Sequence, residues 1–213
     1  MIKMKDETKH LQMNEAMWDE WAGWLDTDNR RTRYLREAQS KVISGLDIQP
    51  RIHFLDIGCG TGWAVGQAAN LVNDQGLFYG VDLSPKMVEK AKSNFSGKEN
   101  FHFLQANSES IPLDDDFFDI IICTNSFHHY LHPEKVLKEM RRLLKSGGKL
   151  YLLDPVADSW IIKFWDVLAK LKEPEHVKIY STKEFRSLFQ QAGLKYLTKN
   201  GINWHAAIHV GEK

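Results

Sequence analysis

The chain has 213 residues, of which 43% are hydrophobic and 26% charged. That is enough apolar material for a full core, and residues 1–213 are most simply interpreted as one domain. The 28 Lys and Arg residues equal the 28 Asp and Glu residues, so the formal net charge is zero. This balance disfavours nucleic acid or an anionic membrane as the main partner, although a local basic patch is compatible with it.

The N-terminus is charged and lacks the apolar core of a signal peptide, and no apolar run has the length of a membrane span. Two cysteines, Cys59 and Cys123, each end a predicted strand, and two thiols cannot form a thiolate cage for a metal ion. We therefore expect a cytoplasmic protein with two free thiols and no metal site. The sequence does not indicate an oligomeric state.

The first fifty residues form a predicted helical cap, because they carry no strand pattern. Trp18, Trp21, Trp24 and Leu25 recur at spacings of three and four residues, which places them on one helix face. A second helix is predicted over about 30–45 and ends at a glycine.

Strands and helices alternate from residue 51 onward. The uninterrupted isoleucines at 120–122 are typical of a central strand that is buried on both faces. Ser84 followed by Pro85 is typical of a helix start. The predicted strands are 52–57, 77–83, 101–106, 118–124 and 149–154, and the predicted helices are 63–72, a segment from Pro85, and 133–145, which Gly147 and Gly148 stop.

The segment 156–180 has a less regular pattern and is predicted to be helical around 160–171. After it, Ser181 and Glu184 form a capping box, and Gly193 ends the helix that this box starts.

Two closing strands are predicted over 194–198 and 202–210. Only residues 199–201 separate them, too few for a parallel crossover, so these strands should be antiparallel. The whole order predicts a doubly wound, mostly parallel, seven-stranded α/β sheet with an antiparallel C-terminal hairpin.

A glycine-rich loop follows the first strand. Asp56, Gly58, Gly60 and Gly62 stand at every second position, and Asp82 follows twenty positions after the last glycine. Glycines let the backbone turn sharply at a strand end and let a ligand approach closely. The second carboxylate, one strand later, is placed to accept hydrogen bonds from two ribose hydroxyls. The pattern predicts a nucleoside-binding crevice.

The glycine spacing distinguishes between classes of nucleoside site. A dinucleotide fingerprint needs a third glycine at the position of Trp63 or Val65, depending on where the count begins. A phosphate-binding P-loop needs a final Gly-Lys-Ser/Thr, which this loop lacks. Both classes are therefore disfavoured.

The loop D-x-G-x-G-x-G resembles motif I of the class I S-adenosylmethionine-dependent methyltransferases. Residues 106–112, 118–123 and 144–148 resemble further motifs of the ubiquinone-biosynthesis-like, small-molecule branch of that family. The resemblance covers about 52–210. Two positions depart from the family pattern: Asn107 replaces an aspartate, and Ser146 replaces a proline. An asparagine can still accept a hydrogen bond from the adenine amino group through its side-chain oxygen.

The resemblance implies the fold of that family, S-adenosylmethionine as cofactor and S-adenosylhomocysteine as its product. It implies that the glycine loop and Asp56 meet the methionine part of the cofactor, that Asp82 holds the ribose, and that the turn after the third strand faces the adenine. It also implies that the N-terminal segment covers the cofactor and that 156–180 contributes to the acceptor site. The implied cofactor-binding residues are Asp56, Gly58, Cys59, Gly60, Gly62, Asp82, Leu83, Met87, Asn107, Ser108, Glu109, Asn125 and Trp18.

Acceptors such as a hydroxyl, an acidic carbon or a protonated amine need a general base. His129 or His128, just after the fourth strand, is the candidate, with capping or packing as the alternative role. His205 and His209 alternate onto one face of the last predicted strand, where a structural role is favoured over a metal pair.

We therefore expect a methyltransferase that acts on an oxygen, nitrogen or carbon atom of a small-molecule acceptor. A non-catalytic S-adenosylmethionine-binding module and a methyltransferase for RNA or protein are the alternatives, the latter disfavoured by the neutral charge. Another nucleoside-dependent enzyme is also conceivable, but aminopropyl transferases typically carry acidic residues where this chain has Asn125 and Ser126. The sequence does not identify the acceptor.

Overall fold

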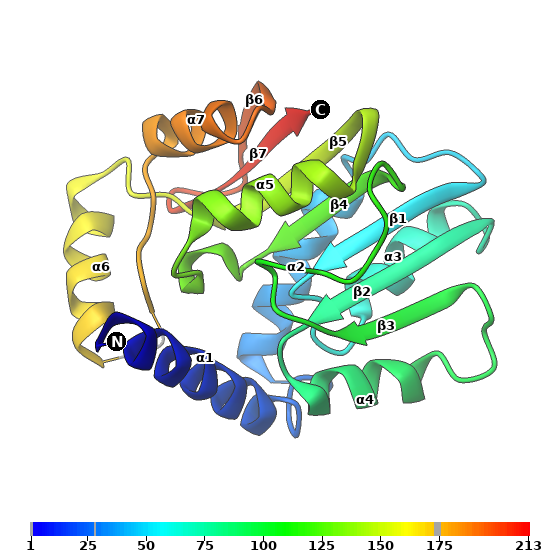
Figure 1. The fold of residues 1–213 in the computed structure, drawn as a ribbon, viewed down its shortest axis with the longest axis horizontal. Helices are drawn as coiled ribbons and strands as arrows, with labels where there is room; N and C mark the ends of the chain where they lie inside the picture. Colours follow the sequence, from blue (N-terminus) through cyan, green and yellow to red (C-terminus); the bar gives the residue numbers. More distant parts are fainter. Residues whose placement is uncertain (1, 28, 173–175) are drawn as a thin grey trace.

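A computed structural model describes residues 2–27, 29–172 and 176–213. Within these ranges, seven strands form one sheet in the order β3-β2-β1-β4-β5-β7-β6 (Figure 1). The first five pair in parallel, and β7 pairs antiparallel with both β5 and β6. The strands are β1 (Ile52–Ile57), β2 (Gly76–Asp82), β3 (Phe101–Gln105), β4 (Phe118–Thr124), β5 (Leu144–Pro155), β6 (Lys195–Gly201) and β7 (Ala206–Glu212). The predicted sheet and its antiparallel hairpin are confirmed.

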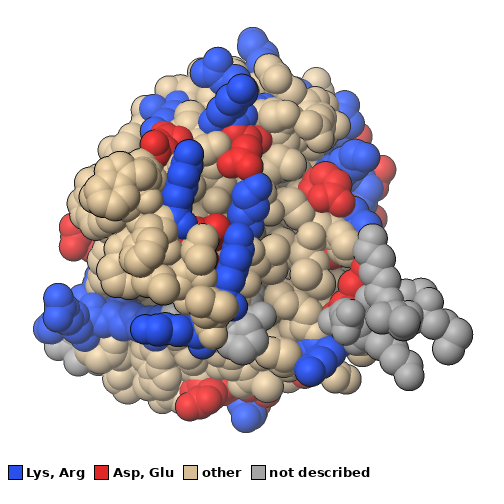
Figure 2. All heavy atoms as spheres, turned by 90° about the vertical axis from the view of Figure 1, so that its left-hand side faces the viewer, with Lys and Arg blue, Asp and Glu red and all other residues tan. Residues whose placement is uncertain are grey.

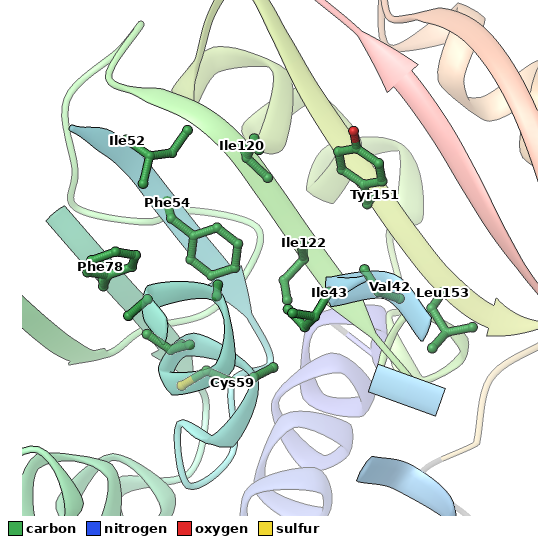
Figure 3. Close-up of a cluster of buried hydrophobic side chains, with 14 of the residues drawn as sticks. Val42, Ile43, Ile52, Phe54, Cys59, Phe78, Ile120, Ile122, Tyr151 and Leu153 are labelled. Atoms are coloured by element: carbon green, nitrogen blue, oxygen red, sulfur yellow. The ribbon is translucent and has the colours of Figure 1, made fainter. Parts of the chain in front are cut away.

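Helices cover both faces of this sheet, and a buried apolar cluster lies under each layer (Figure 1). Figure 3 shows the first cluster, in which Val42 and Ile43 of α2 face side chains of the central strands. The second cluster joins the other face to α5 and α7. The helices are α1 (Ile2–Trp21), α2 (Arg30–Ile43), α3 (Trp63–Leu71), α4 (Pro85–Asn94), α5 (Pro133–Leu143), α6 (Trp160–Lys172) and α7 (Thr182–Gln191).

Helix starts follow local chemistry that was readable in the sequence. Ser84 precedes α4, and its hydroxyl accepts a hydrogen bond from the Met87 N–H at 3.1 Å. At α7, Ser181 and Glu184 form the complete reciprocal capping box. These caps determine the residues at which α4 and α7 begin.

The prediction that Gly147 and Gly148 stop the helix before β5 was wrong. The helix ends at Leu143, and Leu144 already pairs with Phe118 of β4. Pairing resumes at Lys149 after a shift of register, and Gly147 within the shifted segment has a φ of +76°. The glycines therefore make an irregularity inside β5, where a left-handed conformation is needed.

The predicted turn of the C-terminal hairpin was also displaced. Residues 199–201 belong to β6, and the turn lies over 202–205. The Asn203 side-chain oxygen accepts hydrogen bonds from the backbone N–H groups of His205 and Ala206, which fixes the turn there. His205 consequently lies outside β7, and the prediction that it shares a strand face with His209 was wrong.

The N-terminal tryptophans form a contiguous group, but not along one helix. Helix α1 ends at Trp21, so Trp24 and Leu25 lie in the following turn. The ring centroids of Trp18 and Trp21 are 4.9 Å apart, and those of Trp21 and Trp24 are 4.6 Å apart. In Figure 1, α1 crosses below the sheet from α4 to the neighbourhood of α6.

Candidate functional site

The glycine loop lies at the carboxyl end of β1, where the strand order reverses between β1 and β4. Gly58 has a φ of +79°, and a Cβ atom there would lie 2.7 Å from the Ser126 hydroxyl oxygen. Neither the conformation nor the contact accommodates a side chain. The N–H groups of Gly58 and Cys59 both donate to the Val81 carbonyl, at 2.8 and 3.0 Å. The loop is thereby tied to the end of β2.

Asp82 ends β2 and holds two backbone segments together. Its Oδ2 accepts a hydrogen bond from the Gly60 N–H at 2.8 Å, and its Oδ1 accepts one from the Ser84 N–H at 3.0 Å. The side chain is buried, and desolvation raises the pKa of the Asp82 carboxyl although these hydrogen bonds oppose the rise. A carboxylate in this position can accept further hydrogen bonds from a bound diol.

Asp56 lies beneath the glycine loop with no exposed surface. Neither carboxylate oxygen has a hydrogen-bond partner within the described residues. Desolvation, and secondarily the nearby Asp82, raises the pKa of Asp56 to about 8. Such a group is suited to a cationic partner, because a positive charge beside it would compensate the cost of ionising it.

We expect Asp56→Asn to stabilise the ligand-free protein more at higher pH. The unfolded carboxyl titrates near its ordinary pKa of about 3.9, so between about pH 4 and 8 the folded protein retains a proton that the unfolded chain has released. Stability of the parent protein therefore falls as pH rises through this window, by roughly 1.4 kcal/mol per pH unit at most.

The measurement is the free energy of unfolding in urea for parent and Asp56→Asn proteins, near the two ends of that window. The advantage of the variant should grow toward the alkaline end. An advantage that is the same at both ends would show that Asp56 is not held protonated by the fold.

A cavity of about 590 Å³ opens beside these carboxylates. It brings together most of the residues that the sequence predicted, from five separate segments. Two of them do not line it: Asp56 lies behind the loop, and Gly62 is the N-cap residue before α3, with a φ of +83°. The predicted residues on its wall are Gly58, Cys59, Gly60, Asp82, Leu83, Met87, Asn107, Ser108, Glu109, Asn125, Trp18, His128 and His129.

The turn after β3 forms one end of the cavity. The Asn107 side-chain oxygen accepts a hydrogen bond from the Glu109 N–H at 3.0 Å, which shapes this turn. Across from it, Asn125 has a φ of +54°, and its buried side-chain nitrogen has no hydrogen-bond partner among the described residues. An unpaired buried donor on a cavity wall is suited to a polar ligand.

Two carboxylates that sequence reasoning missed bind α1 and the turn after it to segments beside the cavity. Asp19 accepts a hydrogen bond from the Ser84 hydroxyl at 2.5 Å, close to the end of β2. Asp26 accepts one from the Thr61 hydroxyl in the glycine loop at 2.7 Å. Both contacts join segments far apart in the chain, so no local sequence pattern predicts them.

The opposite end of the cavity contains a histidine paired with a buried acid. His128 Nδ1 donates to the Asp154 Oδ1 at 2.9 Å, and Asp154 has no exposed surface. The carboxylate sets the tautomer, so that Nε2 carries the lone pair of the neutral ring. This arrangement can accept a proton, because the buried acid stabilises the imidazolium that forms.

His129 has a different environment from His128. Its ring meets the Trp18 ring edge-on, with centroids 5.4 Å apart, and its carbonyl oxygen lies 3.1 Å from the His10 Nε2. His176, from the segment after α6, packs 5.6 Å from the His128 ring. The two histidines that the sequence proposed as a base are thus distinguished by Asp154, which pairs with His128. Asp154 is the penultimate residue of β5, and its position near the carboxyl end of that strand was the signal that could have found it.

His209 and His205 have separate structural partners. His209 is buried in β7, bonded to the Tyr196 hydroxyl at 2.8 Å, and burial lowers its pKa to about 4. His205 lies on the cavity wall and bonds the Tyr34 hydroxyl at 2.6 Å. The two thiols are buried and not disulfide-bonded, and burial raises the pKa of Cys123 to about 12.

Comparison with known proteins identifies the family of this arrangement. A family model described as a methyltransferase domain matches residues 48–193. The chain is 36% identical over 159 residues to the uncharacterized methyltransferase YcgJ of Bacillus subtilis, covering 73% of this chain and 62% of that protein. It is 32% identical over 116 residues to the ubiquinone/menaquinone biosynthesis C-methyltransferase UbiE of Vibrio campbellii, covering 52% of this chain and 45% of that protein. The aligned part thus spans less than two thirds of either relative.

Solved structures share the fold. The crystal structure of YcgJ superimposes with a TM-score of 0.73 at 25% identity, covering 84% of this chain and 98% of that one. A methyltransferase from Aquifex aeolicus that depends on S-adenosylmethionine has a TM-score of 0.66 at 22% identity, covering 81% and 88%. With the matched family model and the glycine loop at the sheet's switch point, the chain belongs to the methyltransferase domain family and has the class I methyltransferase fold.

Proposed function

We propose that this protein transfers a methyl group from S-adenosylmethionine to an oxygen, nitrogen or carbon atom of a small-molecule acceptor. One observation carries the proposal: a single cavity joins the glycine loop and Asp82 at one end to the His128–Asp154 pair at the other. One end is suited to a nucleoside and the other to proton removal from an acceptor.

Residues at the donor end fit the cofactor by charge and by shape. We assign the ribose hydroxyls to the Asp82 carboxylate and the methionine part to the glycine loop. The unpaired, buried Asp56 carboxylate suits the positively charged amino group of that part. Leu83 and Met87 offer apolar contact to the adenine, and the turn 107–109 offers its polar edge.

Bound S-adenosylmethionine supplies an activated methyl group whose positive charge disappears on transfer, so the protein needs mainly to align the acceptor and exclude water. Trp18 and Trp21 line the cavity as an aromatic cover. We assign the proton-accepting atom to His128 Nε2 and a positioning role to Asp154, which holds the ring through Nδ1.

A small acceptor is favoured by the size of the cavity and by the relatives. The cavity of about 590 Å³ lies within the usual range of small-molecule sites and is covered by α1. Among the relatives, UbiE is named as a C-methyltransferase of quinone biosynthesis.

Titration calorimetry tests the donor assignment. We expect S-adenosylmethionine and S-adenosylhomocysteine to bind with affinities of about micromolar order, and NAD to give no binding heat, because the third glycine of a dinucleotide site is absent. Absence of binding by both sulfur compounds would exclude the proposal. Binding without methyl transfer in a screen of acceptors with labelled cofactor would favour a non-catalytic module.

A further inference from the structure

Helix α6 presents an apolar face to solvent. Trp160, Phe164, Val167 and Leu171 follow one another at spacings of four, three and four residues, so they lie on one side of the helix. Their exposed fractions are 78%, 58%, 56% and 79%. An exposed apolar stripe of this length is uncommon on a soluble surface and indicates a binding surface.

The opposite face of α6 fixes this orientation. Ile162 and Asp166 are buried, and Asp166 Oδ1 accepts hydrogen bonds from His176 Nε2 at 2.8 Å and from the Ile179 N–H at 2.7 Å. The helix therefore turns its only acidic side chain inward and its aromatic side chains outward. That is the reverse of the usual amphipathic arrangement, in which the apolar side faces the core.

Basic side chains border the apolar stripe. Lys163 lies on one side of it and Lys172 on the other, whereas the Lys170 ammonium pairs with Asp166 Oδ2 at 2.8 Å. Figure 2 shows the face on which α6 lies, with Lys and Arg side chains extended around and between the apolar groups. The neutral charge of the whole chain thus conceals a locally basic and apolar surface.

We propose that α6 is an interfacial helix that docks the protein onto an anionic lipid bilayer. Tryptophan, phenylalanine and leucine on one face with lysines at its border is the composition of helices that lie in the plane of a membrane surface. The lysines can reach phosphate groups while their stems follow the apolar stripe. No helix in the described part of the chain is long and apolar enough to cross a bilayer, so the contact is superficial. This docking proposal does not rest on the proposed methyl transfer.

Cosedimentation with vesicles tests this assignment. We expect the protein to bind phosphatidylcholine vesicles that contain phosphatidylglycerol, to bind pure phosphatidylcholine weakly, and to lose binding as salt is added. The variant Leu171→Glu should lower the partition coefficient about tenfold or more, because it removes the favourable free energy of transferring a leucine side chain out of water. Lys163→Glu with Lys172→Glu should lower it about fivefold per lysine, only on the anionic vesicles.

Leu71→Glu is the matched control, because Leu71 is a half-exposed leucine at the end of α3, away from α6. It should bind vesicles as the parent protein does. Circular dichroism and S-adenosylmethionine calorimetry should be unchanged in Leu171→Glu, which keeps a folding defect from imitating the result. Failure to sediment with anionic vesicles would overturn the proposal, as would equal losses of binding in Leu171→Glu and in the control Leu71→Glu. A parent dimer that Leu171→Glu dissociates, without vesicle binding, would assign the face to a second copy.

Discussion

Replacing Asp82 by alanine is expected to weaken the binding of S-adenosylmethionine and S-adenosylhomocysteine equally, by about a hundredfold or more. Two hydrogen bonds to a charged acceptor contribute about 3 kcal/mol together, and each 1.4 kcal/mol is about tenfold in affinity. Both compounds contain the same ribose, so a ribose contact cannot distinguish them. Calorimetry on the variant measures both affinities directly.

The control for this substitution is Asp82→Asn. Asp82 also accepts the N–H groups of Gly60 and Ser84, so alanine could weaken the loop as well as the ligand contact. Asparagine keeps one acceptor oxygen and the volume of the side chain, and it should bind with intermediate affinity. Thermal unfolding of both variants separates a loss of fold from a loss of contact. Unchanged affinity in a folded Asp82→Ala protein would refute the ribose assignment.

The second large effect concerns turnover. With an acceptor that must lose a proton, His128→Gln is expected to lower kcat by about 10² to 10⁴, the usual range for removal of a general base. The affinity for S-adenosylmethionine should be unchanged, because the ring lies at the acceptor end of the cavity. Asp154→Asn should lower kcat less, since the imidazole stays but loses the charge that orients it and stabilises its protonated form. Single-turnover methyl transfer together with calorimetry gives both quantities.

His129→Gln is the matched control for the neighbouring ring. His129 packs edge-on against Trp18, so its loss should affect the cover over the cavity more than the chemical step. A fall in kcat confined to His129→Gln would transfer the role of base to that residue. Full turnover in both variants would exclude a histidine base for the acceptor tested.

The sheet was predictable because its signals are local. β1 and β4 begin and end where their apolar runs do, and the caps at Ser84 and Ser181 fix two helix starts. The proximity of Asp56, the glycine loop and Asp82 was predictable for the same reason, since they belong to one strand–loop–helix–strand unit.

The parts that escaped prediction depend on contacts between distant segments. Asp154 has significance only because β5 lies beside β4, which brings it to His128. The carboxylates of Asp19 and Asp26 act only after the N-terminal segment has folded back over the glycine loop. One miss was local: the hairpin turn lies over 202–205 because the Asn203 side chain accepts two hydrogen bonds from backbone N–H groups, which periodicity does not show.

Two adjacent residues of α1 serve opposite ends of the cavity. Asp19 bonds Ser84 beside the donor end, whereas Trp18 contacts His129 at the acceptor end. Because both contacts come from one helix, a displacement of α1 that breaks the first contact would also shift the second. The helical cover therefore couples the two ends of the cavity mechanically.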